Sequence, residues 1–200
     1  MRAADGLPES GRLDLGAFAR LFDQRTNSYK FFFFLALLDR IAGSDGASHP
    51  DLDRPIPVYE LAVDMVLGAW YPHGFCRLSL GSQDQLQLAV DSIHWGPVRG
   101  SWIQANGVEW RRLRETCASQ LHIEKFIRYV PFRLLRPFFA GEMRGIPDQQ
   151  ADKRLAELSV ELFQERKPLY CFTEDRSAII VQHDWLEYLE RNCSIVRAWA

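Results

Sequence analysis

The spacing of apolar residues along the chain predicts a protein built mainly from helices. The stretch from Ser28 to Ala42 follows good N-cap residues, is apolar almost all round and stops at Gly43, so we expect a helix that other elements surround. Between Val58 and Ala69, apolar residues recur at the three- and four-residue spacing of one helical face. Further helices are expected over residues 14–22, 82–93 and 150–165, from 108 onward, and from His183 or Asp184.

Proline and glycine residues separate these helices. The segments 44–57 and 69–85 are rich in turn residues and predict loops, and 131–148 combines prolines with arginines. The helical pattern that starts at Val108 changes phase near His122, where the apolar face turns by about 130°. This change indicates either a kink near His122 or a helix that is buried on two sides.

Two short runs of aromatic and β-branched residues, 169–173 and 177–182, flank a polar turn and predict a β-hairpin. The fold class that follows is mainly α, with one compact multi-helix domain over residues 1–200. We expect a frayed segment at 1–13, one small C-terminal hairpin at 168–182 and a terminal helix at 183–200. Because the chain ends in the apolar stretch SIVRAWA, we expect either a cut at residue 200 or a partner that covers this end.

Composition excludes several classes of protein. A chain of 200 residues that is 47% hydrophobic and 25% charged can bury a core, which excludes disordered and collagen-like chains. The four cysteines form no paired motif and the first residues lack the pattern of a signal peptide, so we expect free thiols and a cytoplasmic protein. The longest apolar run covers only residues 31–38. A helix across a bilayer needs about 20 residues, so no membrane partner is expected.

Positive charge is concentrated in one part of the chain. The formal net charge is −2, yet residues 111–144 hold eight Lys or Arg against three Asp or Glu. Guanidinium groups bind phosphate oxygens in pairs, so this basic segment is the candidate nucleic-acid-binding site. The alternative is that its cations pair with the protein's own carboxylates or lie on a solvated helix surface. The candidate residues are Arg111, Arg112, Arg114, Lys125, Arg128, Arg133, Arg136 and Arg144.

The sequence shows no catalytic constellation, so we predict no catalytic residue, no metal ligand and no cofactor. Asp148 and the run from Glu165 to Lys167 match the PD…ExK pattern of metal-dependent nucleases, but a helix between them would hold the two acids about 25 Å apart. The five histidines lack the spacing of a zinc site. An enzyme that uses His73, in the turn WYPHG, is the least favoured hypothesis.

Several spaced motifs resemble a known family. They are the helix start RTNSYKFFFF, the turn WYPHGF followed by LSLGSQDQ, the segment VPFRLLRPFF, and the hairpin and helix that end in WLEYLERN. Together they resemble the amino-terminal region of bacterial HNH-endonuclease-containing proteins, over residues 22–193. In that family these motifs precede the nuclease module, whose histidine-bearing finger has no counterpart here. The resemblance therefore implies the non-catalytic part of such a protein.

Two functions are expected from these observations. The first is a bacterial, DNA-binding module that positions an HNH-type nuclease in defence against foreign DNA, with RNA left open as the nucleic acid. The second is a protein-interaction subunit that docks a partner chain through an aromatic-rich surface, which includes Trp95, Trp102 and Trp199.

Overall fold

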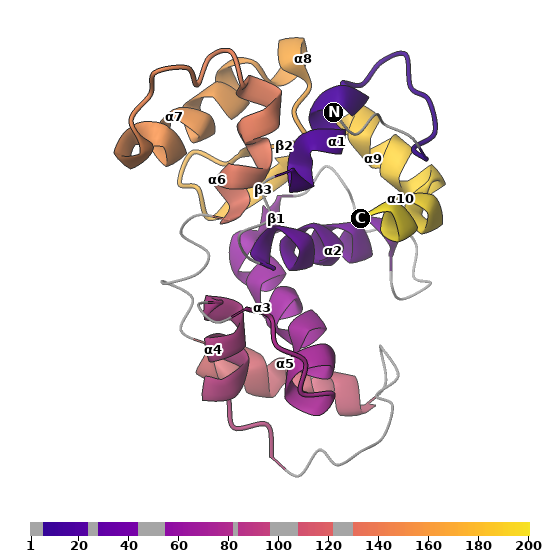
Figure 1. Cartoon of the computed structure of the whole chain (residues 1–200), viewed down its shortest axis with the longest axis vertical. Helices are drawn as coiled ribbons and strands as arrows, with labels where there is room; N and C mark the ends of the chain where they lie inside the picture. The colour runs from indigo at the N-terminus through magenta and orange to yellow at the C-terminus, as the bar shows by residue number, and fades with distance from the viewer. Residues whose placement is uncertain (1–5, 24–27, 44–54, 82–83, 97–107, 122–129) are drawn as a thin grey trace.

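The computed structural model describes residues 6–23, 28–43, 55–81, 84–96, 108–121 and 130–200. Within these ranges the chain is mainly helical and carries one small antiparallel sheet, so the predicted fold class is confirmed (Figure 1).

Helix α2 (Tyr29–Ala42) is the central element of the fold. Half of its fourteen residues are buried: Phe32, Phe33, Phe34, Ala36, Leu37, Leu38 and Ile41. Helices α3 (Val58–Ala69), α6 (Val130–Leu135), α9 (His183–Arg191) and α10 (Cys193–Trp199) pack against it. The helix ends at Gly43, which adopts the left-handed conformation (φ 61°) expected of a C-terminal glycine.

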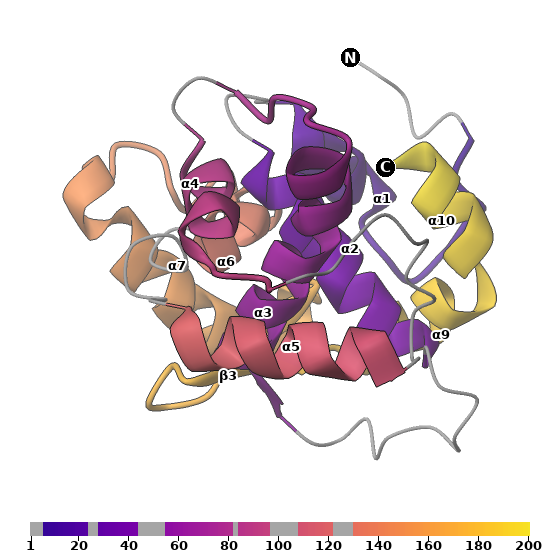
Figure 2. The same ribbon diagram turned by 90° about the horizontal axis from the view of Figure 1, so that it is seen from below.

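A lower group of helices packs against α3 (Figure 1). It consists of α4 (Gln85–Ser92), α5 (Val108–Gln120) and a π-helical turn, η2 (Trp70–Phe75), and Figure 2 shows it from below. The predicted loop over residues 69–85 is therefore partly wrong, because the chain stays helical through Pro72 and Gly74. At Gly74 a Cβ atom would lie 3.0 Å from the Trp70 ring, so glycine allows this indole to pack over the wider turn.

An upper group packs on the other side of α2. It contains α1 (Leu15–Ala19), η1 (Arg20–Phe22), η4 (Arg136–Phe139), α7 (Asp148–Glu161) and α8 (Phe163–Arg166), together with α6, α9 and α10. Leu7 and Leu13 are buried and the Tyr188 hydroxyl donates to the Pro8 carbonyl oxygen at 2.8 Å. The part of the amino-terminal segment that the structure describes therefore packs against the core.

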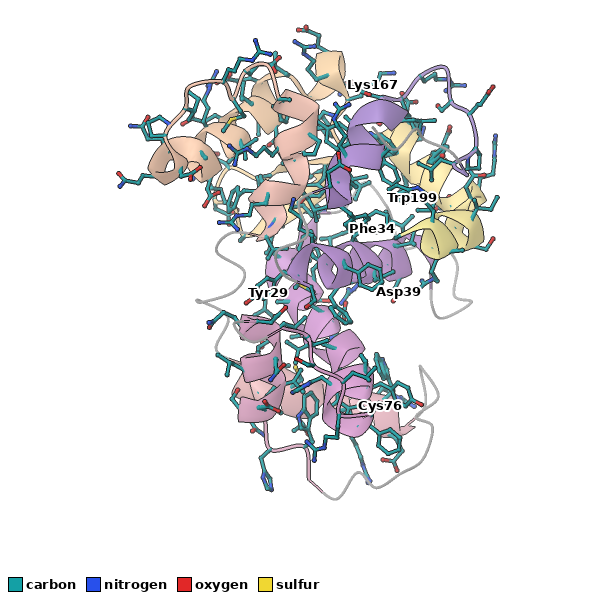
Figure 3. The ribbon with its side chains drawn as sticks, in the orientation of Figure 1. Tyr29, Phe34, Asp39, Cys76, Lys167 and Trp199 are labelled. Atoms are coloured by element: carbon teal, nitrogen blue, oxygen red, sulfur yellow. The ribbon has the colours of Figure 1, made fainter. Side chains whose placement is uncertain are left out.

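The carboxyl-terminal helix α10 also packs inward. The Trp199 ring stacks on Phe18 with a centroid distance of 5.3 Å, and Arg197 forms an ion pair with Asp39 on α2. Figure 3 labels Trp199 and Asp39. This chain therefore covers part of the indole, through contacts that the sequence pattern did not predict.

The sheet has three strands in the order β1-β3-β2. Strands β2 (Tyr170–Phe172) and β3 (Ala178–Val181) form the predicted hairpin, in which Tyr170 pairs with Val181. The third strand, β1 (Ile56–Pro57), pairs with β3 and lies in a segment predicted to be a loop. It was missed because it is two residues long and its partner lies more than a hundred residues away.

The predicted change of helical phase near His122 lies outside the described residues, as do residues 122–129 in general. Helix α5 ends at Gln120, and the next described element is α6.

One buried carboxylate joins the starts of α2 and α4. Asp84 is 2% exposed, and its Oδ2 accepts hydrogen bonds from the backbone N–H of Ser28 at 2.9 Å and the Ser28 hydroxyl at 2.7 Å. Its Oδ1 accepts from the backbone N–H of Leu86 at 2.9 Å. Beside it, the Gln85 N–H donates to the Tyr29 hydroxyl, and burial followed by the charge of Asp84 raises the pKa of Tyr29 to about 12. Two of the resembling motifs, TNSYKF and LSLGSQD, thus meet at this point.

Replacing Asp84 by alanine removes the acceptor for both helix starts and leaves buried N–H groups unpaired. We expect Asp84→Ala to lower the free energy of unfolding by about 2–4 kcal/mol, measured by urea denaturation. The control is Asp14→Ala, which removes an acceptor from α1 alone and should cost about 1 kcal/mol. Equal losses in the two variants would contradict the double role of Asp84.

Candidate nucleic-acid interface

The structure divides the basic segment between the two helix groups. Arg111, Arg112 and Arg114 lie on α5 in the lower group, whereas Arg133 lies on α6 and Arg136 on η4 in the upper group (Figure 1). Arg144 follows η4 and is exposed, while Lys125 and Arg128 lie outside the described residues. Closeness in the sequence therefore does not place these side chains on one surface.

Arg114 belongs to an internal network of charges. Its Nη2 lies 3.2 Å from Glu60 and 3.4 Å from Asp64, and both acids are also bound by Arg40, at 2.7 and 2.6 Å. Burial raises the pKa of Asp64 despite its two arginine partners. Burial also opposes ionisation of Glu60, but Arg40 and Arg114 lower its pKa overall. This network joins α2, α3 and α5, so Arg114 has a structural role and is not available to phosphate.

The exposed surface of α5 carries both signs of charge. Arg111 and Arg112 are exposed and form no ion pair with any described residue, but Glu109 and Glu115 are exposed on the same helix. Their charges balance those of the two arginines. Helix α5 therefore does not present the continuous basic stripe that would favour a polyanion.

Four cations gather where η1, α2, α6 and η4 meet, and we call Arg20, Lys30, Arg133 and Arg136 the basic cluster. The Arg20 guanidinium reaches the Pro137 carbonyl oxygen at 3.5 Å, and the Lys30 ammonium donates to the Leu21 carbonyl oxygen at 3.4 Å. Arg20, Arg133 and Arg136 are exposed, and Lys30 is half-buried. The Lys30 contact connects the start of α2 to η1, and the Arg20 contact connects η1 to η4.

The cations of this cluster repel one another. Burial lowers the pKa of Lys30, the charges of Arg133 and Arg136 lower it further, and Asp23 opposes the change. The nearest carboxylate recorded for Arg136 is that of Asp148, at 3.9 Å and 93% exposed, where an ion pair contributes little. Among the described residues, neither Arg20 nor Lys30 has a carboxylate within ion-pair distance. Lys30 is therefore affected more by burial and the two neighbouring arginines than by the one nearby acid, Asp23.

Sequence reasoning found half of this cluster. Arg133 and Arg136 belong to the predicted segment, whereas Arg20 and Lys30 lie about a hundred residues earlier. The available signal was Lys30 itself, a lysine one residue into an otherwise apolar helix, whose ammonium needs an exit from the core.

His73 is held inside the η2 turn. Its Nδ1 lies 2.8 Å from the Leu78 carbonyl oxygen and its Nε2 lies 3.0 Å from the Asp91 carboxylate, so both ring nitrogens have partners. The ring is only 8% exposed. This geometry gives His73 a positioning role in the turn rather than the exposure that a general base needs.

The two acids of the PD…ExK pattern lie in different helices. Asp148 begins α7 and Glu165 lies in α8, with the length of α7 between them. In the part of the chain that the structure describes, no group of three or more His, Cys, Asp or Glu side chains could hold a metal ion.

Two of the three tryptophans predicted for a docking surface are partly covered by this chain. The Trp95 ring lies 5.9 Å from that of Trp70 and donates to the Val90 carbonyl oxygen, and Trp199 stacks on Phe18. Trp102 lies outside the described residues.

No protein-family model, curated protein or solved structure matches this chain. Among the helices of the described ranges, none has the length and apolar character of a membrane-crossing segment.

Removing the charge of Lys30 tests the repulsion within the cluster. We expect Lys30→Met to raise the free energy of unfolding at low salt by about 0.5–1 kcal/mol, because it relieves both burial of a charge and repulsion from two arginines. The gain should shrink as added salt screens the cluster. The control is Lys153→Met on α7, which removes an exposed ion pair with Glu157 and should not stabilise the protein. A loss of stability in Lys30→Met would overturn this account.

Proposed function

We propose that this protein is a cytoplasmic, non-catalytic DNA-binding module that contacts the phosphate backbone through the basic cluster. The observation that supports the proposal is the gathering of Arg20, Lys30, Arg133 and Arg136 from four elements. Among the described residues, neither Arg20 nor Lys30 has a carboxylate within ion-pair distance. Like charges held together cost stability in the free protein, and a bound polyanion reverses that cost. Arginine in particular binds phosphate through paired hydrogen bonds.

This proposal changes the list of DNA-binding residues that was predicted from the sequence. Arg114 leaves the list because Glu60 and Asp64 occupy it, and Arg111 and Arg112 contribute little because acids share their surface. Arg20 and Lys30 enter it in their place. Four cations in one cluster suit contact with a short stretch of DNA phosphate backbone rather than with a long wrapped duplex. A short contact of this kind is enough for a module that positions another domain.

The biological setting of the proposal comes from the motifs. Their likeness to HNH-endonuclease-containing proteins suggests that the DNA is the substrate of such a nuclease and that this module positions it during bacterial defence. The cytoplasmic setting is supported by the four cysteines, all of which are free thiols, because disulfides are rare in reducing compartments.

A salt titration tests the phosphate contacts. For a labelled duplex, the logarithm of the association constant should fall linearly with the logarithm of the salt concentration, with a slope of about −3 to −4 for four neutralised phosphates. The double variant Arg133→Gln/Arg136→Gln should make this slope shallower by about two and weaken binding at low salt. Fluorescence anisotropy gives both quantities.

The matched control is Arg111→Gln/Arg112→Gln, which removes the same charge from α5. It should leave most of the slope and affinity intact. Equal effects of the two double variants would show that only net charge matters, and no measurable duplex binding at low salt would end the proposal.

A further inference from the structure

A second surface of the protein concentrates exposed aromatic side chains. Three large apolar side chains are exposed within the eight residues 71–78: Tyr71 at 39% and Phe75 at 43% in the η2 turn, and Leu78 at 58% just after it. The Tyr71 and Phe75 rings stack with a centroid distance of 5.5 Å and an interplanar angle of 19°. This part of the chain lies in the lower helix group, where Figure 3 labels Cys76.

The turn that carries these rings is held firmly. The backbone N–H groups of Cys76, Arg77 and Leu78 donate to carbonyl oxygens within the turn at 2.9–3.0 Å. The buried His73 ring connects the Leu78 carbonyl oxygen to Asp91 of α4. Exposed rings on a rigid support lose little conformational entropy when a ligand binds, which favours a binding role over accidental exposure.

Two further features of the turn are typical of binding sites. The six residues of η2 form a π-helical turn, a geometry found frequently at functional sites. Arg77 has a φ of 58°, which is unfavourable for a residue other than glycine and requires support from its surroundings.

Charge decides which kind of ligand this surface suits. Between Trp70 and Gly81 the sequence holds no Asp or Glu, and the exposed Arg77 makes no ion pair with any residue that the structure describes. Exposed aromatic rings beside a guanidinium match a nucleobase and its phosphate, because every base has a face that stacks on an aromatic ring.

We propose that the η2 turn binds an unpaired nucleotide, whose base stacks on the Tyr71–Phe75 pair and whose phosphate contacts Arg77. This inference rests on the proposed function and goes beyond it, because the basic cluster is proposed to contact only phosphate groups and the η2 turn would contact a base. Together the two surfaces favour DNA that carries a single-stranded segment over a continuous duplex.

The test compares labelled single-stranded oligothymidine with a duplex of the same length, again by fluorescence anisotropy. Phe75→Leu keeps an apolar side chain but removes the ring, and it should weaken single-strand binding about fivefold or more while leaving duplex binding unchanged. Arg77→Gln should make the single-strand salt slope shallower by about one. The control is Leu88→Ala, at an exposed apolar position on α4 that has no ring, and it should change neither.

Tryptophan fluorescence gives a second readout that does not depend on affinity. The Trp70 ring lies 6.5 Å from Phe75, so a base stacked there should quench the share of the protein's tryptophan emission that comes from Trp70 when oligothymidine is added in saturating amounts. Duplex DNA bound through the basic cluster should not produce this quenching.

The outcomes separate this inference from the function on which it rests. If the wild-type protein binds both DNAs and Phe75→Leu changes neither affinity, the nucleotide site is refuted while the basic cluster stands. If Phe75→Leu only abolishes self-association in sedimentation experiments, the turn is a contact between copies of this chain and the inference is likewise refuted. If the wild-type protein binds neither DNA, the proposed function itself fails.

Discussion

Helix α2 has apolar side chains on almost every side, and covering them is the constraint on which the structure depends. Each buried Phe or Leu side chain contributes roughly 1.5–3 kcal/mol, so a helix with seven buried residues cannot remain on a surface. Helices α3, α6, α9 and α10 approach it from different sequence regions for this reason. The few polar side chains of α2 are then confined to its ends and edges. Lys30, near the start, consequently lies close to Arg133 of α6 and Arg136 of η4.

Polar contacts determine how the lower helices attach to this core. Asp84 joins the starts of α2 and α4, and the network of Arg40, Glu60, Asp64 and Arg114 joins α2, α3 and α5. Both arrangements place charge where it has partners. The same contacts remove Arg114 from the surface chemistry, so the stability of the lower group limits what α5 can bind.

The two proposed binding surfaces differ in the physics that they use. The basic cluster assembles side chains from distant elements, and its attraction to phosphate is long-ranged and sensitive to salt. The η2 turn presents neighbouring residues on a support held by backbone hydrogen bonds and His73, and its contact with a base is short-ranged. In the proposed DNA-binding role, the basic cluster accounts for contact with the phosphate backbone and the η2 turn for a preference for unpaired bases.

The sequence by itself determined the helices with strong periodicity and clear ends, such as α2 and α3, and the hairpin of β2 and β3. These features depend on local propensity and on contacts between near neighbours. Only the tertiary structure decided that Pro72 continues in a π-helical turn, that Ile56 pairs with Ile179, and that Trp199 stacks on Phe18. It also decided which residues form the basic cluster. A count of charges along the sequence does not show which cations lie on one surface and which form an ion pair with an acid. The η2 turn depends on hydrogen bonds within residues 71–78 and on the contact of His73 with Asp91, which no periodic pattern of apolar residues reveals. The other cases depend on contacts between residues far apart in the chain, which local propensity does not specify.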